Sequence, residues 1–219
     1  MKIAIWHHTI LSGGTRPIET SSACGILDEQ MRALDESGLL KEADEFHIGL
    51  NGDADDLAMA RMFIPCPDAK FYVHSKAATT EIHTLNALRA WLPAHPDWVV
   101  LYHHMKGVTQ PHNPLYTAWR HCMERHLVWN WKTCQNDINR SMDSCGAHWL
   151  TPQQFPGMVS GPFWGGNFWW STAKFLLTLP PLPESTWKNR HDAESWIGLG
   201  PKPPRVRDYH AKWPSMACE

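Results

Sequence analysis

The chain has 219 residues, enough for a buried core, and we expect residues 1–219 to form a single domain. Its formal net charge of -2 excludes a protein that holds nucleic acid or an anionic membrane by bulk positive charge. The opening residues lack the apolar core and cleavage site of a signal peptide, and no apolar stretch approaches the ~18 residues that a membrane span needs. We therefore expect a cytoplasmic protein with no membrane span.

The first half of the sequence predicts alternating strands and helices. An amphipathic helix is expected over residues 23–37, because apolar side chains recur at helical spacing and Gly38 follows as a stop. The acidic residues 53–56 open a second helical segment. The expected strands, which are rich in apolar residues and bounded by turn residues, are 2–6, 45–50 and 70–74.

The clearest unit is a helix that continues to Trp91 and is followed by an apolar strand over residues 98–102. That strand ends in the polar run His103-His104-Met105-Lys106-Gly107. In open α/β sheets, ligands bind at the carboxyl ends of the strands. The sequence therefore favours a ligand site over a plain loop at this position.

The second half predicts a long helix over residues 116–140, a loop over 152–162 and an aromatic, glycine-rich stretch over 163–171. A short helix over 173–179 is stopped by two prolines. The residues after the proline-rich segment 201–204 are expected to wrap back over the domain surface. The sequence indicates neither an internal repeat nor a second domain.

Cysteine and tryptophan usage adds two expectations. The cysteines form no CxxC pair, which disfavours a zinc ribbon or a disulfide scaffold. We expect reduced, mostly buried thiols at Cys24, Cys66, Cys122, Cys134, Cys145 and Cys218. The 13 tryptophans suit either a thick core or a sugar-facing cleft, because an indole has a flat apolar face and a polar edge. For each tryptophan taken singly, the core is the better interpretation.

Four motifs occur in order along the chain: a strand ending in His-His-Met-Lys-Gly, a Trp-Arg pair, a Gly-Gly-Asn-Phe-Trp-Trp run and an Arg-His-Asp-Ala-Glu-Ser-Trp run. They begin at residues 101, 119, 165 and 190. Together they resemble a family of glycosyltransferase-like proteins found in bacterial polysaccharide clusters and viral genomes. The resemblance also includes the opening strand with its His pair and residues 48–52 and 84–86, so it spans nearly the whole chain.

The resemblance implies the glycosyltransferase A-type fold, an α/β Rossmann-like mixed sheet with flanking helices that binds the nucleotide at its first strands. It also implies a nucleotide-diphosphate sugar as the donor substrate. In that fold the position after the strand 98–102 usually carries a metal-binding DxD motif, but this chain has histidines and a lysine there. A requirement for Mn²⁺ or Mg²⁺ is therefore left open.

The expected donor site uses His7, His8, Asn51, His103, His104, Lys106 and Gly107. A departing diphosphate must be neutralised, and Lys106 with Gly107 offers a point charge and a close backbone approach. The alternative for Lys106 is a solvated surface lysine. His103 and His104 point to opposite sides if the strand continues, so at most one is expected to reach the donor.

The expected catalytic base is Asp192 or Glu194, because inverting sugar transfer needs a carboxylate to take the acceptor proton. The location resembles the acidic motif that carries the base in many inverting A-type enzymes. Partial desolvation next to Trp196 is expected to raise the pKa of the base. The alternative is that Asp192 caps a helix while Glu194 faces solvent.

The expected acceptor site uses Trp119, Arg120, Asn167, Trp169 and Trp170. Asn167 offers an amide for a sugar hydroxyl, and the adjacent tryptophans offer an aromatic face. The alternatives are a turn followed by a core strand, and an Arg120 ion pair with Glu124 at i+4. His210 resembles the late histidine that completes metal coordination in A-type enzymes, although a lone tail histidine is usually a surface residue.

These features predict a glycosyltransferase that moves a sugar from a nucleotide-diphosphate donor to a hydroxyl acceptor, with a glycan as the favoured acceptor and an inverting mechanism. One alternative keeps the chemistry but makes the acceptor a hydroxylated base in viral DNA. Another is a non-catalytic, Trp-rich carbohydrate-binding domain. A metallohydrolase is the weakest alternative, because the sequence contains no HExxH or comparable ligand set.

Overall fold

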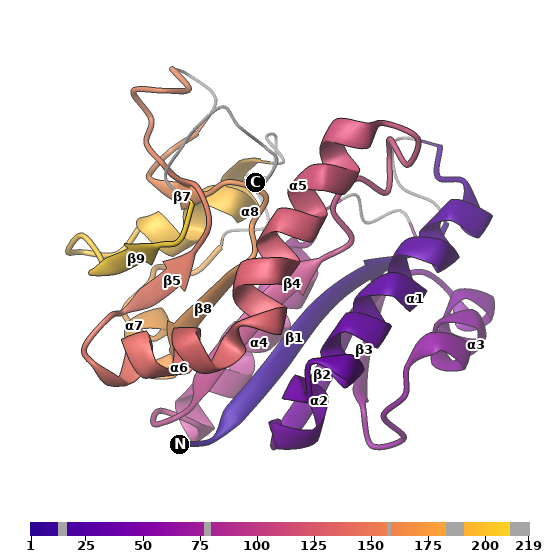
Figure 1. Ribbon diagram of the computed structural model, residues 1–219, viewed down its shortest axis with the longest axis horizontal. Coiled ribbons are helices and arrows are strands. Elements are labelled where there is room, and N and C mark those ends of the chain that lie inside the picture. Colours follow the sequence, from indigo (N-terminus) through magenta and orange to yellow (C-terminus); the bar gives the residue numbers. More distant parts are fainter. Residues whose placement is uncertain (13–16, 77–79, 157–158, 183–190, 211–219) are drawn as a thin grey trace.

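The computed structural model describes residues 1–12, 17–76, 80–156, 159–182 and 191–210. Its centre is a seven-stranded sheet with the order β3-β2-β1-β4-β8-β5-β9 (Figure 1). The strands are β1 (Ile3–Ile10), β2 (Glu45–Asn51), β3 (Lys70–His74), β4 (Val99–His104), β5 (Ser144–Gly146), β8 (Trp169–Thr172) and β9 (Val206–Asp208). A second sheet pairs β6 (Trp149–Leu150) with β7 (Phe163–Trp164).

The strand directions divide the large sheet into two parts. β3, β2, β1 and β4 are parallel, in the order of the first half of a dinucleotide-binding fold. β8 is antiparallel to both β4 and β5, while β9 is parallel to β5. This mixed, Rossmann-like sheet with flanking helices confirms the predicted fold class.

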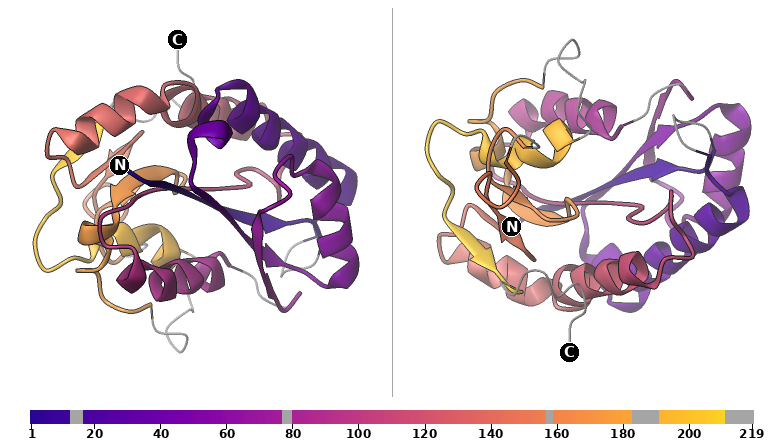
Figure 2. Two further views of the ribbon diagram at one scale, coloured as in Figure 1. Left: turned by 90° about the horizontal axis from the view of Figure 1, so that it is seen from below. Right: turned by 90° about the horizontal axis from the view of Figure 1, so that it is seen from above.

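Helices cover both faces of the sheet, as the two views in Figure 2 show. One face packs against α1 (Thr20–Glu36), α2 (Leu39–Glu42), α3 (Ala54–Phe63), α5 (Pro114–Glu124), η2 (Arg125–Trp129) and α6 (Trp131–Asn139). The other packs against α4 (Ile82–Trp91), η1 (Leu92–Ala94), α7 (Ala173–Leu176), α8 (His191–Ser195) and η4 (Trp196–Gly198). Among these described helices, none is long and apolar enough to cross a membrane.

Alternation along each strand divides the apolar residues between two cores. Ile3 and Ile5 of β1 enter the core beneath α1 and α5, while Ala4 and Trp6 enter the core beneath α4 and α7. Successive side chains of a strand point to opposite faces, so a strand covered on both sides is apolar throughout. The same alternation continues to the last residues of β1 and β4 and determines which of their histidines line the cavity described below.

Three sequence-based expectations differ from the structure. The helix expected over 116–140 is interrupted, because the segment η2 is π-helical and a new helix begins at Trp131. Within the described part of the tail, Val206–Asp208 joins the sheet beside β5, where strand pairing satisfies its backbone groups, and does not wrap over the domain surface. Cys24, Cys66, Cys134 and Cys145 are free thiols, but Cys122 is disulfide-bonded, so the prediction of a reduced thiol is wrong there. Cys218 lies outside the described residues.

Candidate active site

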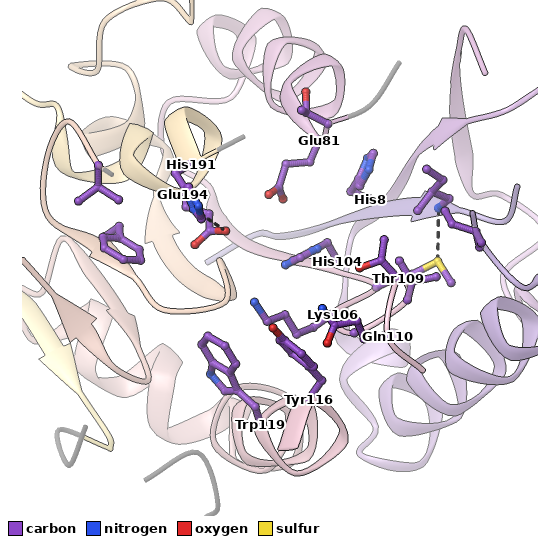
Figure 3. A pocket seen from close by; sticks show the side chains of 18 of the residues that line it. His8, Glu81, His104, Lys106, Thr109, Gln110, Tyr116, Trp119, His191 and Glu194 are labelled. Carbon is purple, nitrogen blue, oxygen red and sulfur yellow. Dashed lines mark hydrogen bonds and ion pairs between the residues drawn. The ribbon is translucent and has the colours of Figure 1, made fainter. Parts of the chain in front are cut away.

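A cavity of about 260 Å³ opens where β1 and β4 end, between the two layers of helices (Figure 3). Its charged lining comes from one helix layer and from the sheet: Glu81 precedes α4, Glu194 lies on α8, and Lys106 follows β4. Figure 3 shows these side chains and that of His104 converging on one open space. The apolar part of the wall consists of Ile10, Ile18, Met105, Val108, Leu150, Phe155, Val159 and Phe163.

Lys106 projects into this cavity from the turn that follows β4. Its Nζ lies 3.9 Å from the ring centroid of Trp119 and 5.7 Å from that of Tyr116. The electron-rich face of an indole attracts an ammonium group, so the two rings hold the lysine in place. Gly107 follows with φ of 88°, a left-handed conformation that glycine adopts without the steric cost of a Cβ. The structure thus presents a cation and a sharp turn at the same wall.

Arg120 supports this turn from behind and lies outside the lining of the cavity. Its Nη1 donates to the carbonyl of Lys106 at 3.0 Å, while Nε and Nη2 donate to the two oxygens of Glu29 at 2.9 and 3.1 Å. The expected partner Glu124 is more distant, at 3.9 Å. Because the guanidinium is buried and occupied in this way, Arg120 positions Lys106 and does not reach an acceptor.

The imidazoles of His8 and His104 contribute hydrogen-bonding groups to the cavity. His104 Nε2 lies 2.7 Å from the carbonyl of Gly166, and since a carbonyl only accepts, Nε2 carries a proton. His8 Nδ1 lies 2.8 Å from Thr84 Oγ1 on α4. Burial is the main reason that the pKa of His8 lies well below 6.5, and the nearby His104 lowers it further. His8 is therefore uncharged at neutral pH.

Glu194 supplies a carboxylate on the opposite wall from Lys106. Its side chain is 17% exposed, and Oε1 lies 3.6 Å from His191 Nδ1. Burial acts to raise the pKa of Glu194, but the hydrogen bond from His191 and the charge of Lys106 outweigh it, so the net pKa is lowered from 4.5. The expected raised pKa is thus wrong for Glu194, because the hydrogen bond from His191 and the nearby positive charges together exceed the cost of desolvation. The side chain of Asp192 is outside the described part.

Glu81 is a second cavity carboxylate, which the sequence motifs did not single out. It is buried at the start of α4, and the hydroxyl of Tyr102 donates to its Oε2 at 2.6 Å. Burial and this neighbouring carboxylate raise the pKa of Tyr102 well above 10. The sequence feature that could have identified Glu81 is a glutamate just before an apolar helix. That pattern also fits an ordinary helix start.

Three residues expected to bind the donor face away from the cavity. His7 lies on the other face of β1, where its Nδ1 is 2.7 Å from Thr9 Oγ1 and burial lowers its pKa to about 4. His103 is buried between His7 and Phe168, with ring centroids 4.5 and 5.7 Å away. Asn51 donates to the carbonyl of Thr80 at 3.0 Å and so supports the cavity wall indirectly. Of the adjacent histidines in β1 and β4, His8 and His104 line the cavity.

The aromatic platform expected from Asn167, Trp169 and Trp170 is part of the core. Trp169 stacks on Tyr102 with centroids 5.0 Å apart and donates from Nε1 to Asn167 Oδ1 at 2.8 Å. Trp170 donates from Nε1 to the carbonyl of Leu127 at 2.8 Å. Both indoles are buried because β8 lies between β4 and β5 with helices on both faces. Among the expected acceptor residues, only Trp119 lines the cavity.

Candidate metal ligands gather away from the cavity. Over the described ranges, two groups of at least three His, Cys, Asp or Glu side chains bring their ligand atoms within 4.8 Å of one another. One is Cys122, His126 and His210, and the other is Glu29, His121 and Glu124. Neither group lines the cavity, and His210, the late histidine singled out by the A-type resemblance, belongs to the first of them.

A buried polar network joins β1, α1 and α5 behind the cavity. The amide of Gln30 donates to the carbonyl of His104 and to Glu124 Oε1, both at 3.1 Å, and its oxygen lies 3.0 Å from His7 Nε2. Burial, together with the charge of Glu29, raises the pKa of Glu124 to about 8. Glu124 is therefore protonated in the folded protein at neutral pH.

The raised pKa of Glu124 predicts a specific pH dependence of stability. The unfolded chain releases this proton above pH 4.5 and the folded chain only near 8, so the free energy of unfolding falls as pH rises through that window. At about 1.4 kcal/mol per pKa unit, Glu124→Gln should gain on the order of 3–5 kcal/mol relative to the parent between pH 5 and 9. Urea unfolding across this range measures the difference, with the exposed Glu42→Gln as control. Parallel curves for parent and Glu124→Gln would contradict it.

No protein-family model matches the sequence. A comparison with curated proteins also finds no match. Among solved structures, the chain is similar to 4-diphosphocytidyl-2C-methyl-D-erythritol synthase from Anaerococcus prevotii, with a TM-score of 0.51, 11% identity and coverage of 97% of this chain and 88% of that one. At this identity the similarity concerns the fold, and it agrees with the Rossmann-like sheet described above.

Glucosyl-3-phosphoglycerate synthase from Mycobacterium tuberculosis, solved with Mn²⁺, uridine diphosphate and glucosyl-3-phosphoglycerate, is a weaker match. Its TM-score is 0.41 at 10% identity, and the similarity covers 82% of this chain and 59% of that one. The similarity at a TM-score of 0.51 thus supports the α/β fold alone, and the chemistry of this chain must be argued from its own cavity.

Proposed function

We propose that this chain is a glycosyltransferase that moves a sugar from a nucleotide-diphosphate donor to a hydroxyl acceptor with inversion. The observation that carries the proposal is the pairing of Lys106 and Glu194 on opposite walls of one cavity at the carboxyl ends of parallel strands. A cation suits the departing diphosphate, and a carboxylate suits the proton of the attacking hydroxyl.

The proposed step is a single displacement at the anomeric carbon. The acceptor oxygen forms a bond to that carbon while the bond between the carbon and the diphosphate oxygen breaks. Glu194, or Asp192 two residues earlier, takes the acceptor proton, and the negative charge released on the nucleoside diphosphate is stabilised by Lys106. His8, which is uncharged at neutral pH, and His104 offer hydrogen bonds to phosphate or sugar oxygens.

The opposite, apolar part of the cavity suits the hydrophobic face of a sugar ring. Leu150, Phe155 and Phe163 line it from the segment around the small second sheet, and Trp119 adds an indole beside Lys106. Aromatic and aliphatic walls with a few convergent polar groups are typical of small-ligand sites. We therefore propose a glycan or another small hydroxyl compound as the acceptor.

A panel of nucleotide sugars, measured by thermal shift and by release of nucleoside diphosphate, tests this function. A donor that binds the folded chain should raise the unfolding temperature, and an acceptor should increase nucleoside diphosphate release. Release of pyrophosphate from a nucleoside triphosphate would replace the proposal with nucleotidyl transfer. Glycan binding without any nucleotide binding would instead identify a carbohydrate-binding domain. Transfer to hydroxylated DNA alone would identify a modified base in DNA as the acceptor.

We predict that transfer persists without added Mn²⁺ or Mg²⁺. In the described part of the cavity, Lys106 supplies a positive charge, and no group of three close ligand atoms lies there. Protein passed over a chelating resin should retain at least part of its rate in divalent-free buffer. A complete loss of transfer that Mn²⁺ restores would overturn this prediction. It would indicate that a bound cation neutralises the leaving diphosphate.

A further inference from the structure

A group of nitrogen and sulfur ligands lies outside the cavity, between the α5–η2 helical segment and the end of β9. Cys122 on α5 and His126 on η2 are four residues apart, so they lie on the same side of this segment. His210 follows β9. One ligand atom from each of these three residues lies within 4.8 Å of the other two.

A further imidazole adjoins this group. The ring of His148 lies 4.9 Å from that of His210 and nearly perpendicular to it, at 84°. His148 is buried, with 1% of its surface exposed, and its φ of 63° is uncommon for a residue with a Cβ. Such a conformation persists only where the surroundings hold it, and it is concentrated at functional sites.

One carboxylate fixes the two loops that carry His148 and His210. Asp208 Oδ1 accepts hydrogen bonds from the backbone N–H groups of both histidines, at 2.9 and 3.0 Å, and Oδ2 accepts from that of Trp149 at 2.9 Å. Both oxygens are therefore used for backbone support. This is the role of outer residues in metal sites, which orient the ligands without binding the ion.

One imidazole nitrogen of this group is buried and lacks a hydrogen-bond partner. Nε2 of His126 is in this situation over the described part of the chain. Burying a polar nitrogen without a partner is costly, and a bound cation would remove that cost.

We propose that Cys122, His126 and His210 bind a zinc ion when Cys122 is reduced, with His148 as the fourth ligand. One thiolate and three imidazoles form a nitrogen and sulfur set, which Zn²⁺ accepts in tetrahedral geometry and which Mg²⁺ and Mn²⁺ disfavour. Zn–N bonds of about 2.0–2.1 Å and a Zn–S bond of about 2.3 Å place ligand atoms ~3.5 Å apart. The three atoms, which lie within 4.8 Å of one another, would need to approach by at most about 1.3 Å.

The disulfide of Cys122 makes this site dependent on redox state. A phosphine reductant gives the disulfide two electrons and becomes a phosphine oxide by taking the oxygen of one water molecule, whose hydrogens complete the two thiols. Cys122 then releases its proton as sulfur binds zinc. In the disulfide form the sulfur is a poor ligand, so reduced and oxidised chains should differ in zinc affinity.

Metal analysis of the full-length chain tests the proposal without reference to activity. After treatment with a phosphine reductant and dialysis against Zn²⁺, the chain should carry about one tightly bound zinc, and Co²⁺ in its place should show thiolate-to-cobalt charge transfer and the intense absorption of a tetrahedral site. Cys122→Ser should abolish the charge-transfer band. Asp208→Asn should weaken zinc binding by about 10–100-fold, as expected for a residue that orients ligands.

Matched controls separate this site from adventitious binding. Cys66→Ser removes a free thiol elsewhere, and His112→Ala removes an exposed imidazole that pairs with Glu19. Both should bind zinc like the parent. Circular dichroism of each metal-free variant checks its fold. A reduced parent chain that takes up no zinc, or whose cobalt form lacks the thiolate band, would overturn the proposal whether or not the variants fold.

Discussion

Lys106→Met should reduce kcat/KM for sugar transfer by about 10²–10³-fold, the usual cost of removing one group that stabilises developing charge. The ammonium is held over Trp119 and Tyr116 at the cavity wall, so it meets the leaving diphosphate without rearranging. The loss of stability should be small, about 1 kcal/mol, because only the interaction with the rings is removed. Steady-state kinetics and thermal unfolding measure the two effects separately.

Lys132→Met is the matched control for this substitution. Lys132 also lies over an indole, 5.4 Å from the ring centroid of Trp131, but it is exposed and far from the lining of the cavity. It should leave the transfer rate unchanged while removing a similar interaction with a ring. Lys106→Arg should recover part of the rate because it keeps the charge. Full activity in Lys106→Met would remove Lys106 from the mechanism.

Glu194→Gln should cut the transfer rate by about 10²–10⁴-fold at saturating acceptor, the range expected for loss of a general base. The amide keeps the shape of the side chain, so donor binding should persist in a thermal-shift assay. Because the pKa of Glu194 is lowered, its carboxylate stays ionised at every pH above that pKa. The transfer rate should therefore decline only when the pH drops below 4.5. An acid limb above neutral pH would contradict this assignment.

Two further substitutions, made alongside Glu194→Gln, test the other carboxylates that could act as the general base. Asp192→Asn tests the neighbouring carboxylate of the same motif. Glu81→Gln tests the carboxylate that accepts from Tyr102 on the α4 side of the cavity. If Glu194→Gln transfers normally and one of these two does not, the base moves to that residue. Normal transfer by all three would indicate a mechanism without a carboxylate base.

The sequence predicted the features that depend on local patterns. The strand at 70–74 has the bounds expected from its apolar residues, and the helix at 20–36 closely matches the expected one. The alternation of side chains also placed His103 and His104 on opposite sides of β4, so that one of them faces the cavity. Lys106 lies at a ligand cavity because a strand that ends in the middle of a parallel sheet delivers its next residues there.

The missed features depend on contacts between distant parts of the chain. Trp169 and Trp170 are core residues because β8 pairs with β4, with Leu101 opposite Trp170, and no local pattern reveals that pairing. Arg120 binds Glu29, which is 91 residues earlier, and not the nearby Glu124. The position of Glu81 in the cavity similarly depends on the packing of α4 beside β4, whose Tyr102 donates to its carboxylate from 21 residues further along the chain. Local sequence patterns predicted the kind of residues at the site. Contacts between distant segments determine which of those residues line the cavity.

The amide of Gln30 limits how far this protein could be redesigned. Its two N–H groups and its oxygen each serve a different partner, on β4, α5 and β1, so a leucine of similar size would remove these hydrogen bonds from the buried side chains of Glu124 and His7 and from the His104 carbonyl. Hydrocarbon repacking, the usual route to a hyperstable variant, is therefore closed at this position. An engineered version with a simpler core must either keep this amide or replace His7 and Glu124 together with it.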